Sequence, residues 1–396
     1  MAIIQSILDT DLYKFTTSYA YCKLFPHAYG EFEFADRDNT IYPPGFDYLV
    51  RQELDAMEQL ALTPDEEAFL RSEVPYLPPF YVDFLKGFRF NPAEVEVSLS
   101  SEGKLSIRSS GLLYRITFWE TPILAIVSEL YFKTTGQEAD MAHVEQATKS
   151  KAAQLQTGGI TFSLFGMRRR YSFAVENEVT ALLKQHAPTS LFGTSNVYLA
   201  FRHGLKVSGT HPHEWVQFHA AMFGYKMANY MSMENWIGVY DGDLGTVLTD
   251  TYTTDVFFSN FSKKHALLFT SLRHDSGDPL TFTDKAIARY EQLRVNPATK
   301  YIVFSDSLNV ERVLEIAAYC CGRIGATFGI GTNLSCDVGN GIKPRNIVMK
   351  LRRCKMKATD PWTPCVKLSD VSGKHTGEEG EITLAQQTLL AMDEAD

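Results

Sequence analysis

Two stretches, ALLFTSLRHDSGD (266–278) and YIVFSDS (301–307), predict the class of fold that this chain adopts. In each stretch a short apolar segment runs into a loop of small, polar and charged residues. Recurrent segments of this kind, separated by helical patterns, are typical of parallel strands joined by crossover helices. We therefore expect strands over Ala266–Phe269 and Tyr301–Phe304, with reactive side chains in the loops that follow them.

The same pattern recurs through the middle of the chain. The further expected strands are Phe162–Phe165, Leu191–Phe192, Val207, Thr246–Leu248 and Ala326–Phe328. Polar clusters follow every one of these segments, whereas a doubly wound open sheet gathers its ligand site at one switch point. The pattern thus favours an α/β fold with an irregular β/α barrel, whose active site lies at the carboxyl ends of the strands. An open sheet is the alternative.

The regions on either side of this middle part show different sequence patterns. A helix is expected after Asp9, and Thr63-Pro64-Asp65-Glu66 predicts another helix start, a capping box with proline at the first helical position. Alternation between residues 95 and 107 indicates a hairpin around Ser101-Glu102-Gly103.

The end of the chain is expected to return to the first region. Strands are predicted over Asn346–Leu351 and Val366–Leu368, and they could rejoin the first domain. We predict an α/β sandwich domain from residues 1–140 with 345–396, and the barrel domain from residues 141–344.

Composition limits the partners. The chain of 396 residues is 45% hydrophobic and 12% aromatic, as expected for a packed globular protein. A net charge of −9 argues against nucleic acid and anionic membranes as partners. The N-terminus has no secretory pattern, and the apolar run 122–127 is too short to span a bilayer. Six cysteines without metal-finger spacing are typical of free thiols, so a cytoplasmic location is expected.

Three loops carry candidate anion-binding or metal-binding residues. Arg168-Arg169-Arg170 precedes a helical pattern and is either a solvated turn or an anion site. Arg273 to Asp278 holds a cation and two carboxylates, a spacing that suits Mg²⁺–diphosphate or sugar hydroxyls and that also occurs in ordinary turns. The glycines of Gly329-Ile330-Gly331-Thr332 let the backbone approach a phosphate closely.

The segment Thr210-His211-Pro212-His213-Glu214 allows several interpretations. His211 and His213 lie two apart at an expected strand end, which fits a metal site of a barrel hydrolase. Alternatively, one histidine is a nucleophile that takes up a phosphoryl group. A histidine that merely caps the barrel face is the structural alternative.

Taken together, the motifs resemble those of the nicotinate phosphoribosyltransferase family, in chain order over nearly the whole length. The matching segments are Asp9–Lys14, Phe88–Phe90, Phe165–Arg170, Gly193–Asn196, Gly209–Trp215, Leu272–Asp278, Val303–Asp306 and Phe328–Thr332. The resemblance implies an α/β sandwich plus an irregular barrel, and a homodimer with shared active sites. In that dimer the segment with Asp11 and Tyr13 reaches into the partner's site.

The resemblance also implies roles for individual residues, to which the residue chemistry above adds. The catalytic set is His213, Glu214 and Asp275; the nicotinate set is Tyr13, Phe165, Arg168, Ser195, Thr210 and Arg273; the phosphoribosyl and phosphate set is Asp306, Gly329, Gly331, Thr332, Arg169 and Arg170; the Mg²⁺ set is Asp250 and Asp278. Tyr13 and Phe165 would sandwich the pyridine ring.

His213 matches the histidine that the family phosphorylates with ATP, although His211-Pro212 before it departs from the usual family pair. Ser195 stands where nicotinamide-specific relatives carry an aspartate, which would repel a carboxylate substrate. The expected function is therefore an ATP-coupled ligase that forms nicotinate mononucleotide from nicotinate and phosphoribosyl diphosphate in NAD salvage, with Mg²⁺ as cofactor. The rivals are a nicotinamide or quinolinate phosphoribosyltransferase, a metal-dependent barrel hydrolase, and a silent relative that binds phosphoribosyl compounds.

Overall fold

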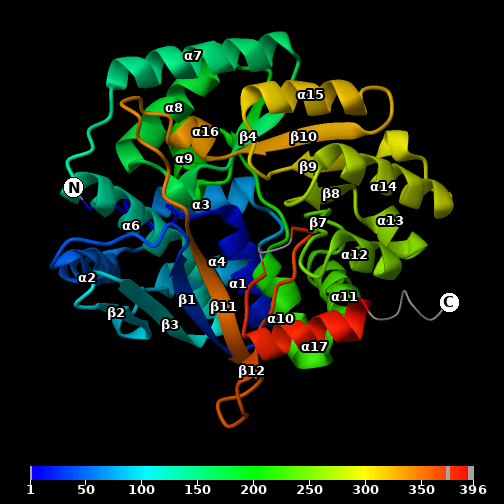
Figure 1. Cartoon of the computed structure of the whole chain (residues 1–396), viewed down its shortest axis with the longest axis horizontal. Coiled ribbons are helices and arrows are strands. Elements are labelled where there is room, and N and C mark those ends of the chain that lie inside the picture. The colour runs from blue at the N-terminus through cyan, green and yellow to red at the C-terminus, as the bar shows by residue number, and fades with distance from the viewer. Residues whose placement is uncertain (1, 372–374, 391–396) are drawn as a thin grey trace. The chain divides into compact units, whose positions relative to one another are not determined.

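The computed structural model describes residues 2–371 and 375–390 (Figure 1). Contacts divide the chain into two compact units. The first unit comprises residues 1–19, 32–209 and 329–350, and the second comprises residues 20–31, 210–328 and 351–396. The predicted division into a sandwich domain and a barrel domain is a different partition and stays a prediction.

The first unit is built mainly from helices and short strands. Its elements are α2 (Phe46–Ala56), α3 (Pro64–Glu73), α4 (Pro79–Gly87), β2 (Val95–Leu99), β3 (Leu105–Leu112), α5 (Leu113–Ile116), α6 (Glu120–Thr134), α7 (Met141–Thr157), β4 (Phe162–Leu164), α8 (Phe173–His186), β5 (Leu191–Thr194), α9 (Val197–His203), β6 (Lys206–Val207) and α16 (Thr332–Ser335). Helices α7 and α8 pack side by side (Figure 1).

The second unit alternates helices and strands. Its elements are α10 (His213–Phe223), α11 (Ala228–Tyr240), β7 (Thr246–Leu248), α12 (Thr254–Asn260), α13 (Lys263–Leu268), β8 (Ser271–His274), α14 (Pro279–Gln292), β9 (Tyr301–Phe304), α15 (Val310–Cys320), β12 (Thr363–Pro364) and α17 (Glu379–Leu390). Four elements run from one unit into the other: α1 (Leu12–Leu24), β1 (Tyr29–Asp36), β10 (Gly325–Ile330) and β11 (Ile347–Lys355).

Six of the seven expected strands lie in the seven-stranded sheet, as β4, β5, β6, β7, β9 and β10. Its strand order is β6-β5-β4-β10-β9-β8-β7, and the pairs β4–β5, β5–β6, β7–β8, β8–β9 and β9–β10 are parallel. This parallel sheet forms a half-barrel, which confirms the predicted class of a mixed α/β fold with an irregular barrel.

One expected strand is wrong. Residues 266–269 do not form a strand, because α13 covers Lys263–Leu268 and the strand β8 follows it. Ser262 starts the helix through a capping box with His265. Ala266 and Phe269 are buried, whereas Leu267 between them is 62% exposed, a spacing typical of a helix.

The second sheet is antiparallel where its pairing is defined, with the order β12-β11-β1-β3-β2. The expected hairpin is confirmed by β2 and β3, which pair Val95 with Ser109 through Leu99 with Leu105. The expected strand near residue 346 is confirmed as β11, beside β1 from the start of the chain. Residues 366–368 are not a regular strand, since Lys367 makes a single bridge with Thr376.

The two predicted helix starts are confirmed. Helix α1 begins at Leu12, shortly after Asp9, and α3 begins at Pro64. Thr63 and Glu66 form the expected capping box, in which each side chain satisfies a backbone N–H of the other residue. Within the described residues, no helix combines the length and the apolar character that crossing a bilayer requires.

Candidate active site

In the second unit, two predicted side chains, those of Asp250 and Asp275, lie near Nε2 of His213, a third predicted residue. Asp250 and Asp275 follow the neighbouring strands β7 and β8, so both carboxylates lie at the same edge of the sheet. The Nε2 atom lies 2.8 Å from Oδ1 of Asp250 and 3.7 Å from Oδ2 of Asp275. Strand β6 ends at Val207, and His213 is the first residue of α10. The expectation that His213 lies at a strand end is therefore wrong.

Lys367 completes this cluster, and the sequence reasoning missed it. Its ammonium nitrogen lies 2.7 Å from Nε2 of His213 and 2.9 Å from Oδ2 of Asp250. A lysine between two apolar residues of a strand-like segment, Val366 and Leu368, was the signal available in the sequence, because such a lysine is rarely buried without a partner.

The environment sets the charges of this cluster. Burial and, after it, the neighbouring Lys367 ammonium lower the pKa of His213 to about 4, so the imidazole is neutral at neutral pH. Burial alone would raise the pKa of Asp275, but Arg273 and its other neighbours bring it down to about 2. The pKa of Asp250 also lies well below its usual range, because His213 and Lys367 outweigh the effect of burial.

Arg273 links the cluster to two hydroxyls. Its Nη2 donates to Oδ1 of Asp275 at 2.8 Å, its Nε to the hydroxyl of Ser305 at 2.8 Å, and its Nη1 to the hydroxyl of Thr210 at 2.7 Å. All three guanidinium nitrogens therefore have protein partners. This arrangement brings together the predicted residues Thr210, Arg273 and Asp275.

His211 and Glu214, which flank the pair Pro212-His213, are both buried. His211 is fully buried, packs edge-on against Trp236 with ring centroids 4.9 Å apart, and has no hydrogen-bond partner for either ring nitrogen among the described residues. Burial lowers its pKa well below the usual value. Glu214 is buried in the first turn of α10. His211 therefore behaves as a packing residue.

The cluster offers the ligand atoms of a metal site, but a lysine ammonium already lies among them. One atom each from His213, Asp250 and Asp275 lies within 4.8 Å of the others. However, the Lys367 ammonium lies within 3 Å of two of these ligands, so the cluster already holds a cation. A resident divalent ion does not fit beside it, because two cations at that distance repel.

Asp278 and Asp306 line a separate cavity of about 210 Å³ in the same unit, together with His274, Gly277, Pro279, Ser307, Leu308 and Arg312. Asp278 caps α14 by accepting from Thr281 and pairs with Arg312 at 3.0 Å. It is not part of the His213 group, so the two predicted Mg²⁺ ligands, Asp250 and Asp278, are not brought into one cluster.

In the first unit, Ser195 contacts Asp11. The Ser195 hydroxyl donates to Oδ1 of Asp11 at 2.6 Å, and both side chains are buried. Burial raises the pKa of Asp11, an effect that Arg168 opposes. Tyr13 follows two residues later in α1, with the Lys14 ammonium 4.8 Å from the centre of its ring.

Phe165 lies against the glycine-rich segment of the same unit. A Cβ atom at Gly329 would come within 2.4 Å of the Phe165 ring, so glycine is required for this approach. Gly331 faces the Phe165 carbonyl, and Thr332 begins α16. The predicted ring-binding residue and phosphate loop are therefore neighbours.

The three consecutive arginines have different environments. The Arg168 side chain is 45% exposed, Arg169 is partly buried, and Arg170 is completely buried. Arg170 donates to Asp9 at 2.8 and 3.1 Å, to Glu176 at 3.1 Å and to the Ile3 carbonyl. Burial, only partly offset by Arg170, raises the pKa of Glu176 to about 7.

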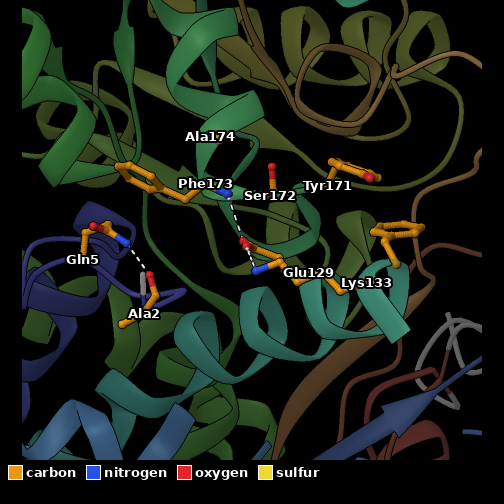
Figure 2. Close-up of a pocket in the computed structure, with 9 residues that line it drawn as sticks. Ala2, Gln5, Glu129, Lys133, Tyr171, Ser172, Phe173 and Ala174 are labelled. Carbon is orange, nitrogen blue, oxygen red and sulfur yellow. Dashed lines mark hydrogen bonds and ion pairs between the residues drawn. The ribbon is translucent and has the colours of Figure 1, made fainter. Parts of the chain in front are cut away.

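A further cavity of about 330 Å³ in the first unit lies beside the start of α8 (Figure 2). Glu129 lies on its wall, where it accepts from the Phe173 N–H at 3.0 Å and pairs with Lys133 at 2.6 Å. Because these charges and the helix N-terminus satisfy one another, we assign no ligand to this cavity.

Two family models match the chain. A model of the nicotinate phosphoribosyltransferase N-terminal domain matches residues 8–128, and the model of the nicotinate phosphoribosyltransferase family matches residues 160–391.

Curated relatives named nicotinate phosphoribosyltransferase match over nearly the whole chain. The protein of Chromohalobacter salexigens is 45% identical over 98% of this chain and 98% of its own length. The protein of Desulforapulum autotrophicum is 41% identical over 96% of this chain and 97% of its own length.

Solved structures agree. Nicotinate phosphoribosyltransferase from Porphyromonas gingivalis has 65% identity and a TM-score of 0.97, over 98% of this chain and 100% of that one. A putative nicotinate phosphoribosyltransferase from Saccharomyces cerevisiae has 29% identity and a TM-score of 0.91, over 98% and 99%. The matches place the chain among the mixed α/β phosphoribosyltransferases. It belongs to the nicotinate phosphoribosyltransferase family and is an enzyme, which confirms the predicted function at the level of the family.

Replacing Arg170 with methionine should destabilise the protein by about 3–5 kcal/mol, because Asp9 and Glu176 lose their buried partner. Arg168→Met, two residues away and exposed, should cost less than about 1 kcal/mol. Urea unfolding of both variants measures the difference. Equal losses of stability in the two variants would contradict the structural role of Arg170.

Proposed function

We propose that this enzyme forms nicotinate mononucleotide and diphosphate from nicotinate and phosphoribosyl diphosphate, and that ATP drives the reaction through phosphorylation of His213. The observation that carries the proposal is the neutral, partly buried imidazole of His213 beside two ionised carboxylates. A neutral imidazole keeps a lone pair on one ring nitrogen and can therefore accept a phosphoryl group.

The residues support the transfer by position and charge. As diphosphate leaves C1 of the ribose, positive charge develops on the sugar, and the carboxylates of Asp275 and Asp306 would stabilise it. The pyridine nitrogen is already a neutral nucleophile, so no residue has to remove a proton from it. Gly329, Gly331 and Thr332 would hold the 5-phosphate, with Arg169 as a further anion contact.

We assign binding of the pyridine substrate to the nicotinate set of residues. Tyr13 and Phe165 would stack on its faces, while Arg168, Thr210 and Arg273 would receive its carboxylate. Arg170 is left out of the phosphate set, because its guanidinium is enclosed by Asp9 and Glu176. Glu214 remains a candidate catalytic residue beside His213.

Mg²⁺, the homodimer with shared active sites and the cytoplasmic location are further parts of the proposal. The Lys367 ammonium already contacts His213 and Asp250, which argues against a resident metal ion in this cluster. We therefore expect Mg²⁺ to arrive with the phosphate-containing substrates.

The activity is tested with three pyridines. Labelled phosphoribosyl diphosphate and Mg²⁺ are incubated with nicotinate, nicotinamide or quinolinate, each with and without ATP. We expect mononucleotide from nicotinate, with ATP raising the yield. Product from nicotinamide or quinolinate instead would move the enzyme to a related specificity, and no product from any pyridine would overturn the proposal.

His213→Ala should abolish the stimulation by ATP and retain part of the ATP-independent synthesis, because the imidazole is the proposed phosphoryl acceptor. The ratio of initial rates with and without ATP measures this. His27→Ala, at an exposed position, is the control and should keep the ratio of the unmodified enzyme. A normal ratio in His213→Ala would remove His213 from the ATP-coupled step.

Ser195→Asp should raise the KM for nicotinate, because a second carboxylate beside Asp11 repels the substrate's carboxylate. Ser195→Asn is the matched control, because asparagine has nearly the same shape as aspartate but carries no charge. Steady-state kinetics on both variants, after their thermal stability has been checked, separates charge from size. An equal change in KM would show that repulsion is not the cause.

A further inference from the structure

Lys367 is held in place by the backbone on both sides. Its N–H and carbonyl both pair with Thr376, and the N–H of Leu368 donates to the carbonyl of Thr251, the residue after Asp250. Val366 and Leu368 are buried in one hydrophobic cluster of the second unit. Alternation along this segment therefore directs the side chain of Lys367 away from that cluster and toward Asp250.

The charges of the cluster balance without a metal ion. Asp250 and Asp275 supply two negative charges, while Lys367 and Arg273 supply two positive ones. Arg273 contacts Asp275, Ser305 and Thr210. The ammonium of Lys367 has three N–H groups, of which two are used by His213 and Asp250.

Nε2 of His213 cannot satisfy both of its neighbours at once. When the ring proton is on Nδ1, Nε2 carries a lone pair and accepts from Lys367; when the proton is on Nε2, it donates to Asp250. Lys367 thus favours the tautomer with the lone pair on Nε2, and the lysine N–H has to leave that lone pair before it can attack a phosphorus atom.

We propose that Lys367 is the resident cation of this cluster, in the place that a metal ion would otherwise take, and that its ammonium binds the phosphoryl group transferred to His213. This inference rests on the proposed phosphorylation of His213. In the step, the Nε2 lone pair forms the N–P bond with the γ-phosphorus of ATP. The bond from that phosphorus to the β,γ-bridging oxygen breaks, and its electron pair leaves with ADP. The ring proton stays on Nδ1, and Lys367 keeps its protons and donates them to the phosphoryl oxygens.

The test uses the full-length enzyme, ATP labelled at the γ-phosphate, and Mg²⁺. Acid-labile label bound to the protein is measured for the unmodified enzyme, Lys367→Gln, Lys367→Arg and His213→Gln. Lys367→Gln should lower the initial labelling rate by roughly tenfold or more, because a charge-assisted contact to the phosphoryl oxygens is lost. Lys367→Arg, which keeps the charge, should recover part of that rate. Lys357→Gln, an exposed lysine in the preceding loop, is the matched control and should label normally.

The outcomes separate the two proposals. If His213→Gln is labelled like the unmodified enzyme, the phosphohistidine proposal itself fails. If His213→Gln loses its label while Lys367→Gln keeps a normal rate, only the role of Lys367 is overturned. Metal analysis of the purified unmodified enzyme gives a second readout: a stoichiometric ion that Asp250→Asn removes would show that a metal, not Lys367, is the cation of the cluster. Circular dichroism and thermal unfolding establish that each variant is folded.

Discussion

Each unit buries a carboxylate against a cation, Asp9 against Arg170 in the first and Asp250 against Lys367 in the second. An ionised group removed from water loses several kcal/mol of solvation unless opposite charge and hydrogen-bond donors replace the water. The surrounding side chains supply such donors: the Ser276 hydroxyl, for example, donates to Asp250. In the second unit the same burial keeps His213 neutral, so the requirement to pair charges and the proposed role of His213 as phosphoryl acceptor have one origin.

Most of the fold could be predicted, because strand and helix periods are written locally in the sequence. The segments around Thr246 and Tyr301 are strands at the expected residues, and the capping box at Thr63 starts its helix. The four apolar residues 266–269 fit either period, so their pattern predicts a strand where the structure has the helix α13. Its helical nature depended on Ser262 and His265, which lie before the apolar run.

The candidate site was predicted less completely. His213, Asp250 and Asp275 could be proposed from their reactive types and from the rule that loops after parallel strands share one edge. Lys367 follows no predicted barrel strand and belongs to no motif, so its contact with His213 depends on a pairing between distant segments that local patterns do not encode. Arg170 looked equivalent to Arg168, because burial of one arginine and exposure of another is decided by the register of the chain at the turn.

The chain passes between the two units within α1, β1, β10 and β11, so neither unit is a continuous segment of the sequence. During synthesis the first unit cannot close until residues 329–350 have left the ribosome, and the second waits for the residues after them. Contacts between such distant segments cost loop-closure entropy before they contribute any stabilising energy, and this slows folding. Apolar surfaces such as those of α6, almost wholly buried in the finished protein, are exposed meanwhile. No single cut in the sequence would therefore separate the two units, since any such cut leaves at least one of them incomplete.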